Sequence, residues 1–278
     1  MRHKDFAIFI CSHGRPDIST VEALKNAGYT GNILIVVDDE DDTYDSYLER
    51  WGKVIQFNKQ HYVDTVDTGT DIPKRKVILY AKCACEDIAK EGKLKAFAIA
   101  DDDFTGFRYR YNEDGKLRSL PMTCTFDDMM DNYLDFLLDN NLCMTSIGTN
   151  QMYMGGELTA EKISGYRIPY SFVFRNVSIP FEWKSELFED VISETLKTQQ
   201  GYFMMQMPWV QLNLKPLYAG ADGGMTDVYQ SVNFVKRLFS VVQYLPSAAK
   251  VVTTHNSTTY RLMKENAFPK LVSSCYRK

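Results

Sequence analysis

The sequence contains no long apolar run. None of its hydrophobic stretches approaches the roughly 20 residues that a helix needs to cross a bilayer. Residues 1–5 lead directly into a short apolar stretch, without the charged start, apolar centre and small-residue cleavage site of a signal peptide. We therefore expect no membrane partner and a cytoplasmic location.

Cysteine is present but follows no metal-binding or disulfide pattern. The six cysteines are scattered among apolar neighbours, and Cys83 and Cys85 stand one residue apart on a predicted helix, where they point to different faces. This distribution predicts reduced packing residues.

Basic charge is also in short supply. Lys and Arg number 32 against 36 Asp and Glu, and the formal net charge is −4. Because nonspecific affinity for DNA depends on neutralising phosphates, this balance argues against broad DNA binding but is compatible with a local basic groove.

No repeat, low-complexity segment or linker divides the chain, so we expect one domain over residues 1–278. Apolar strands are predicted over 6–11, 33–37, 54–57 and 96–100, and helices over 18–27 and 74–90. Strands that alternate with helices predict an α/β fold with a parallel sheet, and such sheets bind ligands beyond the carboxyl ends of their strands.

Three acids, Asp101 to Asp103, end the apolar strand over 96–100. An unpaired carboxylate is costly inside a buried strand, but at its end several can converge on a hard cation. Mg²⁺ and Mn²⁺ favour one or two carboxylates together with substrate phosphates. The triplet therefore predicts a divalent metal beside a nucleoside diphosphate, and a solvated acidic turn is the other interpretation.

Basic residues crowd the predicted start of helix 74–90, where Lys74, Arg75 and Lys76 follow one another. Positive charges oppose the helix dipole at this end, and an anion such as a diphosphate would offset that cost. A solvated basic first turn remains the alternative.

Further polar residues follow the first two predicted strands. Arg15 comes after the first strand, and Asp38 and Asp39 end the second. Because parallel strands end at the same edge, one crevice would collect these side chains with Asp101 to Asp103.

The second half is less regular. A hairpin is predicted over 108–120, helices over 126–140, 186–200 and 227–244, and strands over 143–147, 171–175 and 250–253.

The order of these motifs resembles the nucleotide-sugar glycosyltransferases of the GT-A fold. The residues that carry the resemblance are Ile8-Phe9-Ile10 with Gly14-Arg15-Pro16, Val36-Val37-Asp38-Asp39, Lys74-Arg75, Asp101-Asp102-Asp103 and Phe188-Glu189-Asp190. The resemblance implies a Rossmann-like, mostly parallel central sheet flanked by helices. Residues 1–110 would form the nucleotide-sugar-binding half and 111–278 a smaller, mixed α+β acceptor-binding half.

The resemblance also implies a donor site. Asp101 and Asp103 would be the outer acids of an Asp-x-Asp motif that holds Mn²⁺ or Mg²⁺, while Asp102 would bond the ribose of a UDP-sugar. Asp38 or Asp39 would contact the nucleoside, and the other nucleotide contacts would come from Arg15, Lys74 and Arg75.

An acceptor base and two late residues complete the implied site. Glu189 and Asp190 would be the acidic pair of an inverting enzyme, with Asp190 deprotonating the acceptor hydroxyl. His255 would reach the metal and Arg261 a phosphate, although structural roles remain open for both.

The stretch Cys-Ser-His-Gly-Arg-Pro at 11–16 and the compact length show a narrower resemblance, to phage glycosyltransferases found beside base-oxidising dioxygenases. Those enzymes decorate hydroxymethylated pyrimidines in DNA, which implies a DNA acceptor and, for a phage-encoded chain, the host cytoplasm. Candidate channel residues are Arg108, Arg110, Arg118, Lys215, Lys236 and Arg237. A glycan, a protein or a small molecule remains an alternative acceptor.

Two further function classes fit the sequence less well. A nucleotidyltransferase usually has a glycine-rich phosphate loop early in the chain, whereas residues 12–16 hold a single glycine. An inactive sugar-nucleotide-binding module would not need the Asp101 to Asp103 triplet or the pair Glu189 and Asp190.

Overall fold

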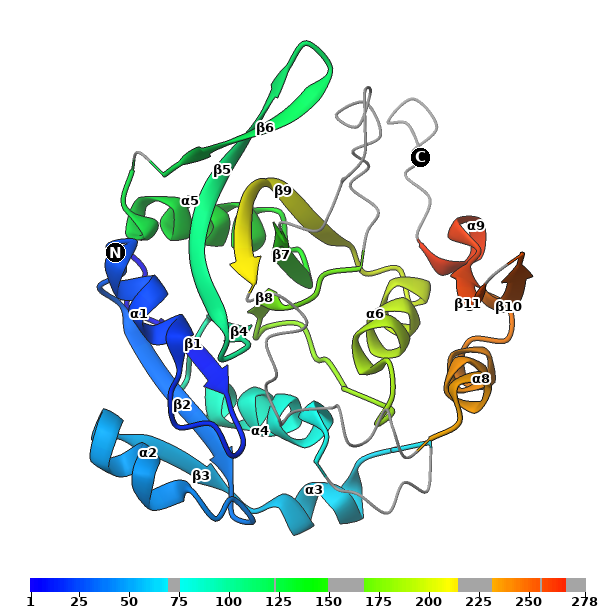
Figure 1. Ribbon diagram of the computed structural model, residues 1–278, viewed down its shortest axis with the longest axis horizontal. Coiled ribbons are helices and arrows are strands. Elements are labelled where there is room, and N and C mark those ends of the chain that lie inside the picture. The colour runs from blue at the N-terminus through cyan, green and yellow to red at the C-terminus, as the bar shows by residue number, and fades with distance from the viewer. Residues whose placement is uncertain (70–75, 123, 150–167, 215–231, 256, 269–278) are drawn as a thin grey trace.

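One large sheet forms the centre of the computed structural model, which describes residues 1–69, 76–122, 124–149, 168–214, 232–255 and 257–268 (Figure 1). Its strands are β1 (Phe6–Cys11), β2 (Asn32–Asp38), β3 (Val54–Phe57), β4 (Ala96–Ala100), β5 (Phe104–Glu113), β6 (Lys116–Pro121), β7 (Met144–Thr149), β8 (Phe172–Asn176) and β9 (Met204–Leu214).

The strand order is β3-β2-β1-β4-β8-β7-β9-β5-β6. Strands β3, β2, β1 and β4 are parallel, as are β7 and β9, and the remaining neighbours are antiparallel. The expected α/β fold, with parallel strands in its first half, is confirmed.

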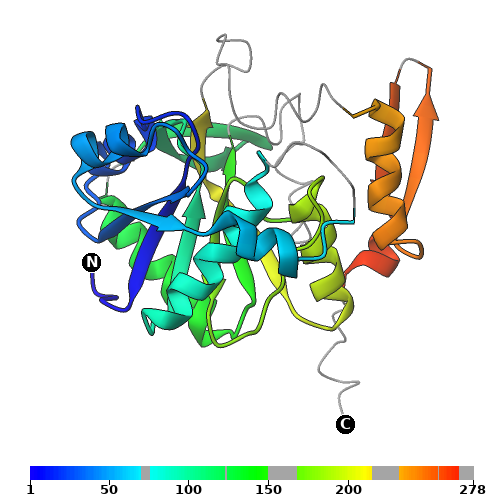
Figure 2. The ribbon, with the colours of Figure 1, turned by 90° about the horizontal axis from the view of Figure 1, so that it is seen from below.

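Helices cover both faces of this sheet. They are α1 (Ser19–Asn26), α2 (Tyr44–Trp51), α3 (Lys59–Thr65), α4 (Ile78–Glu91), α5 (Phe126–Asp139), α6 (Glu189–Gln199), α8 (Phe234–Tyr244) and α9 (Lys264–Ala267). A separate hairpin of β10 (Ala249–Thr254) and β11 (Ser257–Leu262) lies with α8 at the side of the molecule away from β3 (Figures 1 and 2). No helix in these described ranges has the length and hydropathy of a membrane span.

The alternation of side chains along each strand builds two cores. Ile8, Phe126 and Phe172 belong to the core on the α1 and α5 face, whereas Phe9 and Phe97 belong to the core on the α4 face. A third, smaller cluster joins α6, α8 and β10. Both faces of β1 and β4 are therefore buried, which explains why these strands read as continuous apolar runs.

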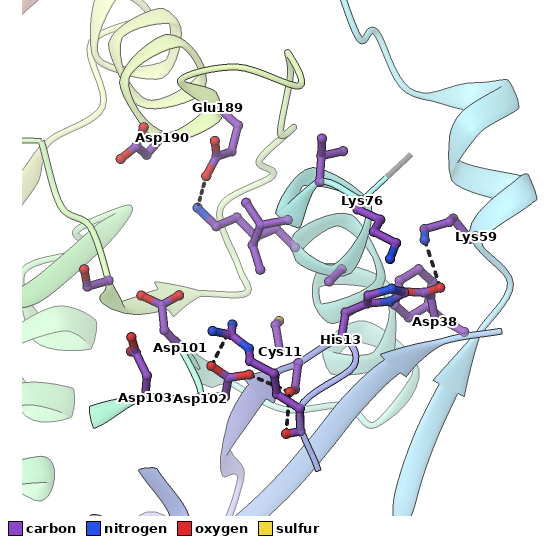
Figure 3. Close-up of a pocket in the computed structure, with 18 of the residues that line it drawn as sticks. Cys11, His13, Asp38, Lys59, Lys76, Asp101, Asp102, Asp103, Glu189 and Asp190 are labelled. Atoms are coloured by element: carbon purple, nitrogen blue, oxygen red, sulfur yellow. Dashed lines mark hydrogen bonds and ion pairs between the residues drawn. The ribbon is translucent and has the colours of Figure 1, made fainter. Parts of the chain in front are cut away.

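The parallel arrangement of β2, β1 and β4 brings their carboxyl ends to one edge. The residues that follow β1, the last residue of β2 and the triplet after β4 all lie there, as Figure 3 shows. Two side-chain contacts hold the triplet against α1. Thr20 donates its hydroxyl proton to the Asp101 carbonyl (2.7 Å) and accepts from the Phe104 amide (2.9 Å).

Two predicted helices begin later than expected. Helix α4 begins at Ile78, with extended backbone at Val77, so Lys76 precedes the helix instead of standing in its first turn. Lys74 and Arg75 lie outside the described residues. Helix α6 begins at Glu189 and not at residue 186, because Phe188 adopts a left-handed conformation with φ 56° and ψ 38°.

Candidate active site

A pocket of about 310 Å³ lies at the carboxyl edge of β1, β2 and β4. Its lining joins predicted site residues from distant parts of the chain, namely Arg15, Asp38, Asp101, Asp102, Asp103, Glu189 and Asp190. Figure 3 shows the acidic triplet on one side of the pocket and Glu189 with Asp190 across from it. This volume is within the range of small-molecule sites.

Asp102 is buried, and both of its carboxylate oxygens have partners. Its carboxylate forms an ion pair with Arg15 (Nη2 to Oδ1, 2.9 Å) and accepts a hydrogen bond from the Ser12 hydroxyl (2.6 Å). Burial raises the pKa of Asp102, and Arg15 opposes that rise. Asp102 therefore orients Arg15 at the pocket wall and has little freedom to bond a ribose directly.

Asp101 and Asp103 differ from Asp102 because neither pairs with a cation. Burial, together with the neighbouring carboxylates Asp103 and Asp102, raises the pKa of Asp101 to about 7, although Lys82 opposes the rise. In Asp103, the buried Oδ1 has no hydrogen-bond partner. Two carboxylates in this condition lack a positive partner.

A divalent cation fits this donor set. Mn²⁺ and Mg²⁺ prefer carboxylate oxygens and complete their coordination with substrate phosphates and water. Within the described part of the chain no group of three or more His, Cys, Asp or Glu side chains is arranged to hold a metal. Asp101 and Asp103, the two acids of the triplet that line the pocket without an ion pair among the described residues, have the carboxylate oxygens that such a cation prefers.

Asp38 closes the other end of the pocket. It accepts from His13 (Nδ1 to Oδ2, 2.8 Å) and from the buried Lys59 ammonium (2.9 Å). Although burial opposes its ionisation, these two partners lower the pKa of Asp38 to about 2. The ionised carboxylate therefore fixes His13 and Lys59 as donors along the pocket.

Glu189 and Asp190 occupy the first turn of α6, where the dipole favours acids. Glu189 forms a buried ion pair with Lys82 of α4 (2.7 Å), and the Lys82 ammonium also lies 4.6 Å from the centre of the Trp183 ring. Although burial opposes its charge, the surrounding carboxylates, with Glu189 first, raise the pKa of Lys82.

Asp190 remains free of any cation of its own. Burial and the neighbouring Glu189 raise its pKa to about 6, against the opposing charge of Lys82. Its Oδ1 accepts from the Val191 amide (2.7 Å), which is a local contact within the helix turn. A carboxylate with a pKa near neutrality in a pocket has the properties of a general base.

The backbone before this pair is strained. Phe188 has left-handed dihedrals, an uncommon conformation for a residue with a side chain, and it directly precedes Glu189. Such strain persists only where the surroundings enforce it, and it concentrates at functional sites. Here it directs the first turn of α6 into the pocket.

Three predicted site residues lie elsewhere. Asp39 is exposed, and its Oδ1 accepts from the Lys59 amide (2.9 Å). His255 and Arg261 are exposed on the β10–β11 hairpin and do not line the described pocket. The structure thus does not bring these three side chains together with the acidic triplet.

Six polar residues of the pocket were missed from the sequence, namely Ser12, His13, Lys59, Lys82, Tyr170 and Ser171. One signal was available for Lys82, because it interrupts an apolar stripe formed by Ile78, Cys85 and Ala89 at helical spacing. A charge on such a stripe is buried and therefore needs a specific partner. No comparable pattern distinguishes Lys59.

The predicted basic channel is divided. Arg108, Arg110 and Arg118 lie on the β5–β6 hairpin, whereas Lys236 and Arg237 lie on α8, which both views place apart from that hairpin (Figures 1 and 2). The expectation of one cluster formed by residues of both elements was wrong, and Lys215 lies outside the described residues.

Solved structures that resemble this fold are distant. Glucosyl-3-phosphoglycerate synthase from Mycobacterium tuberculosis, in complex with Mn²⁺, UDP and phosphoglyceric acid, has 9% sequence identity and a TM-score of 0.45, covering 92% of this chain and 86% of that one. A putative nucleotide-diphospho-sugar transferase from Desulfovibrio desulfuricans G20 has 8% identity and a TM-score of 0.38, covering 87% and 98%. No curated protein matches the chain.

The sequence itself gives a more specific match. A model of the family described as TET-associated glycosyltransferase matches residues 6–209, which include the first strand, the acidic triplet and the start of α6. The chain therefore belongs to the TET-associated glycosyltransferase family.

Proposed function

We propose that this glycosyltransferase moves a sugar from a UDP-sugar to a hydroxyl group with inversion, in the presence of Mn²⁺ or Mg²⁺. The observation that carries the proposal is one pocket that joins the triplet after β4 with the acids that begin α6. The triplet serves the donor, and the pair serves the acceptor.

The donor would lie along the strand ends. His13, held by Asp38, lines one end of the pocket, and Lys76 and Arg15 place positive charge along it. Asp101 and Asp103 would hold the cation, which when bound offsets negative charge on the diphosphate. This arrangement supports a nucleoside diphosphate as the leaving group.

The acceptor step follows from the position of Asp190. Its carboxylate would take the proton of the acceptor hydroxyl as that oxygen forms a bond to the anomeric carbon. The bond from the anomeric carbon to the diphosphate breaks, and UDP leaves with the electron pair. Glu189 is engaged in a 2.7 Å ion pair with Lys82, which leaves Asp190 to take this proton.

We propose that the acceptor is a hydroxymethylated pyrimidine in DNA, for example in the DNA of a phage. The family takes its description from an association with TET. The β5–β6 hairpin carries Arg108 and Arg118, and β9, which pairs with β5, carries the exposed Trp209. An exposed aromatic side chain suits stacking on a base, and arginines suit contact with phosphates. A base in a duplex would have to leave the stack to reach the pocket.

Transfer of a labelled sugar tests the proposal. A panel of UDP-sugars is incubated with Mn²⁺ and either hydroxymethylated or unmodified DNA of the same sequence. We expect label only on the hydroxymethylated DNA, because unmodified DNA lacks the nucleophilic hydroxyl. Hydrolysis of a UDP-sugar without labelling would contradict the DNA acceptor, and neither hydrolysis nor labelling would contradict the donor site as well.

A further inference from the structure

Three polar side chains, one on α6 and two on the central sheet, are buried without a hydrogen-bond partner. Both carboxylate oxygens of Glu194, the Ser146 hydroxyl and both polar atoms of the Gln206 amide are buried in this way. Glu194 and Ser146 are 0% exposed and Gln206 is 1% exposed. Buried polar groups are almost always satisfied by protein or ordered water, so these three side chains require an explanation.

Ser146 and Gln206 project from the same face of the sheet. They are register partners in the parallel pair β7 and β9, where partners share a face. Two residues earlier, Met144 and Met204 are also partners, and both belong to the core on the α4 face. The unsatisfied hydroxyl and amide therefore lie on the α4 face too.

Glu194 is buried towards the same side. It follows Asp190 by four residues, which places both on one face of α6. The charges that act on its carboxyl are Asp190, Lys82, Arg175 and Glu189, so residues of α4 and β8 as well as its own helix surround it. Lys82 is itself a residue of α4 and pairs with Glu189 of α6. Arg175 projects from β8 towards α4, because it pairs with Glu86 of that helix.

Neither nearby cation is available to Glu194. Lys82 is paired with Glu189 at 2.7 Å, and Arg175 is paired with Glu86 at 2.7 Å. A buried carboxylate without a counter-charge is too costly to stay ionised, and neutralisation by a proton is the usual outcome. Burial accordingly raises the pKa of Glu194 well above its ordinary value.

We propose that Glu194 is a positioning residue that keeps its proton throughout turnover and shares internal water with Ser146 and Gln206 behind Asp190. Buried polar groups that lack a protein partner are the groups that ordered internal water satisfies. The role rests on the proposed function of Asp190 as the base, whereas the protonated state and the water do not.

The consequence is a division of roles among the acids of α6. Glu189 pairs with Lys82, Glu194 stays neutral, and Asp190 takes up the acceptor proton. In the reaction the acceptor proton moves to Asp190, the new carbon–oxygen bond forms and the bond to the diphosphate breaks. The Glu194 proton stays in place, so no second negative charge develops one turn behind the base.

Stability measured against pH tests the protonated state without any assay of activity. In the unfolded chain Glu194 ionises above about pH 4.3, whereas in the folded chain it stays neutral. The folding equilibrium constant of wild type relative to Glu194→Gln should therefore fall about tenfold, or 1.36 kcal/mol, for each pH unit between pH 5 and 7. Denaturant titrations measure it, and a ratio that does not change with pH would overturn the proposal.

A second variant keeps this test decisive. Glu194→Met removes both the ionisable group and its hydrogen-bonding atoms. If Glu194→Gln folds poorly, the folding equilibrium constant of wild type relative to Glu194→Met should show the same dependence on pH. A carbonyl stretching band of a protonated carboxylic acid, present in wild type at neutral pH and absent from either variant, would support the same state. Its absence from wild type would contradict it.

Hydrolysis of the UDP-sugar then tests the positioning role. Glu194→Gln preserves neutrality and polarity, so kcat should remain within a few-fold of wild type and the acidic limb of its pH profile should not move. Glu194→Met should lower kcat while the donor KM stays unchanged. A shift of the limb to lower pH in Glu194→Gln would mean that Glu194 is ionised in wild type, and wild-type kcat in Glu194→Met would leave Glu194 a packing residue only.

The two proposals fail in distinguishable ways. If no UDP-sugar is hydrolysed or transferred, the proposed function fails, yet the stability ratio still decides the state of Glu194. If transfer occurs and the ratio is flat, the function stands and the inference about Glu194 falls.

Discussion

At the residue scale, the proposed base is Asp190, a buried carboxylate that interacts with one nearby cation, Lys82. Burial and Glu189 raise its pKa to about 6, and Lys82 limits the rise. A base must be ionised to accept a proton. We therefore expect kcat/KM to fall about tenfold per pH unit below pH 6 and to level off above it.

Replacing Asp190 removes that base. Asp190→Asn should lower kcat by about 10² to 10⁴-fold and leave UDP affinity near wild type, because a base acts in the transition state and not in donor binding. The same change at the exposed Asp45 of α2 is the control. Turnover of Asp190→Asn within a few-fold of wild type would return this acid to a purely structural role in the first turn of α6.

Lys82 should set the pH at which activity falls on the acidic side of the pH–rate profile. Because its charge opposes the rise in the pKa of Asp190, Lys82→Met should move the midpoint of the limb to higher pH. Lys90→Met, on the exposed side of the same helix, should not move it. The pH dependence of UDP-sugar hydrolysis measures both, and an unmoved midpoint in Lys82→Met would show that the two charges do not interact.

Asp103 tests the cation. Its buried oxygen has no hydrogen-bond partner, so Asp103→Asn removes a metal ligand without breaking an ion pair. We expect UDP affinity in Mn²⁺ to fall by more than about tenfold, or ~1.4 kcal/mol, and to match that of wild type in EDTA. Calorimetric titration measures this, and equal affinities of wild type with and without EDTA would contradict a metal-dependent donor site.

At the scale of the elements, one buried ion pair ties α4 to the sheet. Arg175 of β8 is 0% exposed, donates to Glu86 of α4 at 2.7 Å and lies over the Phe181 ring. Glu86→Gln leaves a buried guanidinium without its counter-charge and should lower the free energy of unfolding by about 3 to 5 kcal/mol.

The control for that loss is a double substitution. Glu86→Leu with Arg175→Met removes both charges and should recover much of the stability, since an apolar pair avoids the desolvation of two ions. Denaturant unfolding compares the variants. A double variant as unstable as Glu86→Gln would mean that packing, and not charge, holds α4 to β8.

The elements differ in how well their sequence predicts them. β1, β2 and β4 were predictable because both faces of each strand are buried, and a polar residue can then stand only at the end. This reasoning also located Arg15 and Asp38. β9 was missed because Met204–Leu214 contains a proline and its pairing partners, β7 and β5, are distant in sequence.

The residues of the site also differ in how well the sequence predicts them. The triplet after β4 follows from one strand, and the first turn of α6 follows from acids that suit a helix start. His13 and Lys59 face Asp38 only because the loop after β1, the end of β2 and the start of α3 meet, and no local pattern encodes that meeting. The late start of α4 depends on extended backbone at Val77 and was likewise invisible to helical spacing.

At the scale of the whole molecule, the net charge of −4 means that any contact with DNA depends on a local surface. The β5–β6 hairpin offers one, and Arg118 on it is more than half exposed. Arg118→Gln should weaken DNA binding uniformly across sequences and reduce the slope of log affinity against log salt by about 1. Lys236→Gln on α8 is the matched control and should change neither value, and an equal loss in both would place the DNA across a different face.

The order of strands also has a consequence for synthesis of the chain. β5 and β6 emerge early, yet β5 joins the sheet only through β9, which is encoded about 80 residues later. At about 5–20 residues per second, the ribosome leaves this hairpin without its neighbour for roughly 4 to 16 s. During that interval an unpaired strand edge is exposed to solvent, and nascent chains halted before residue 204 should be the form that most needs a chaperone.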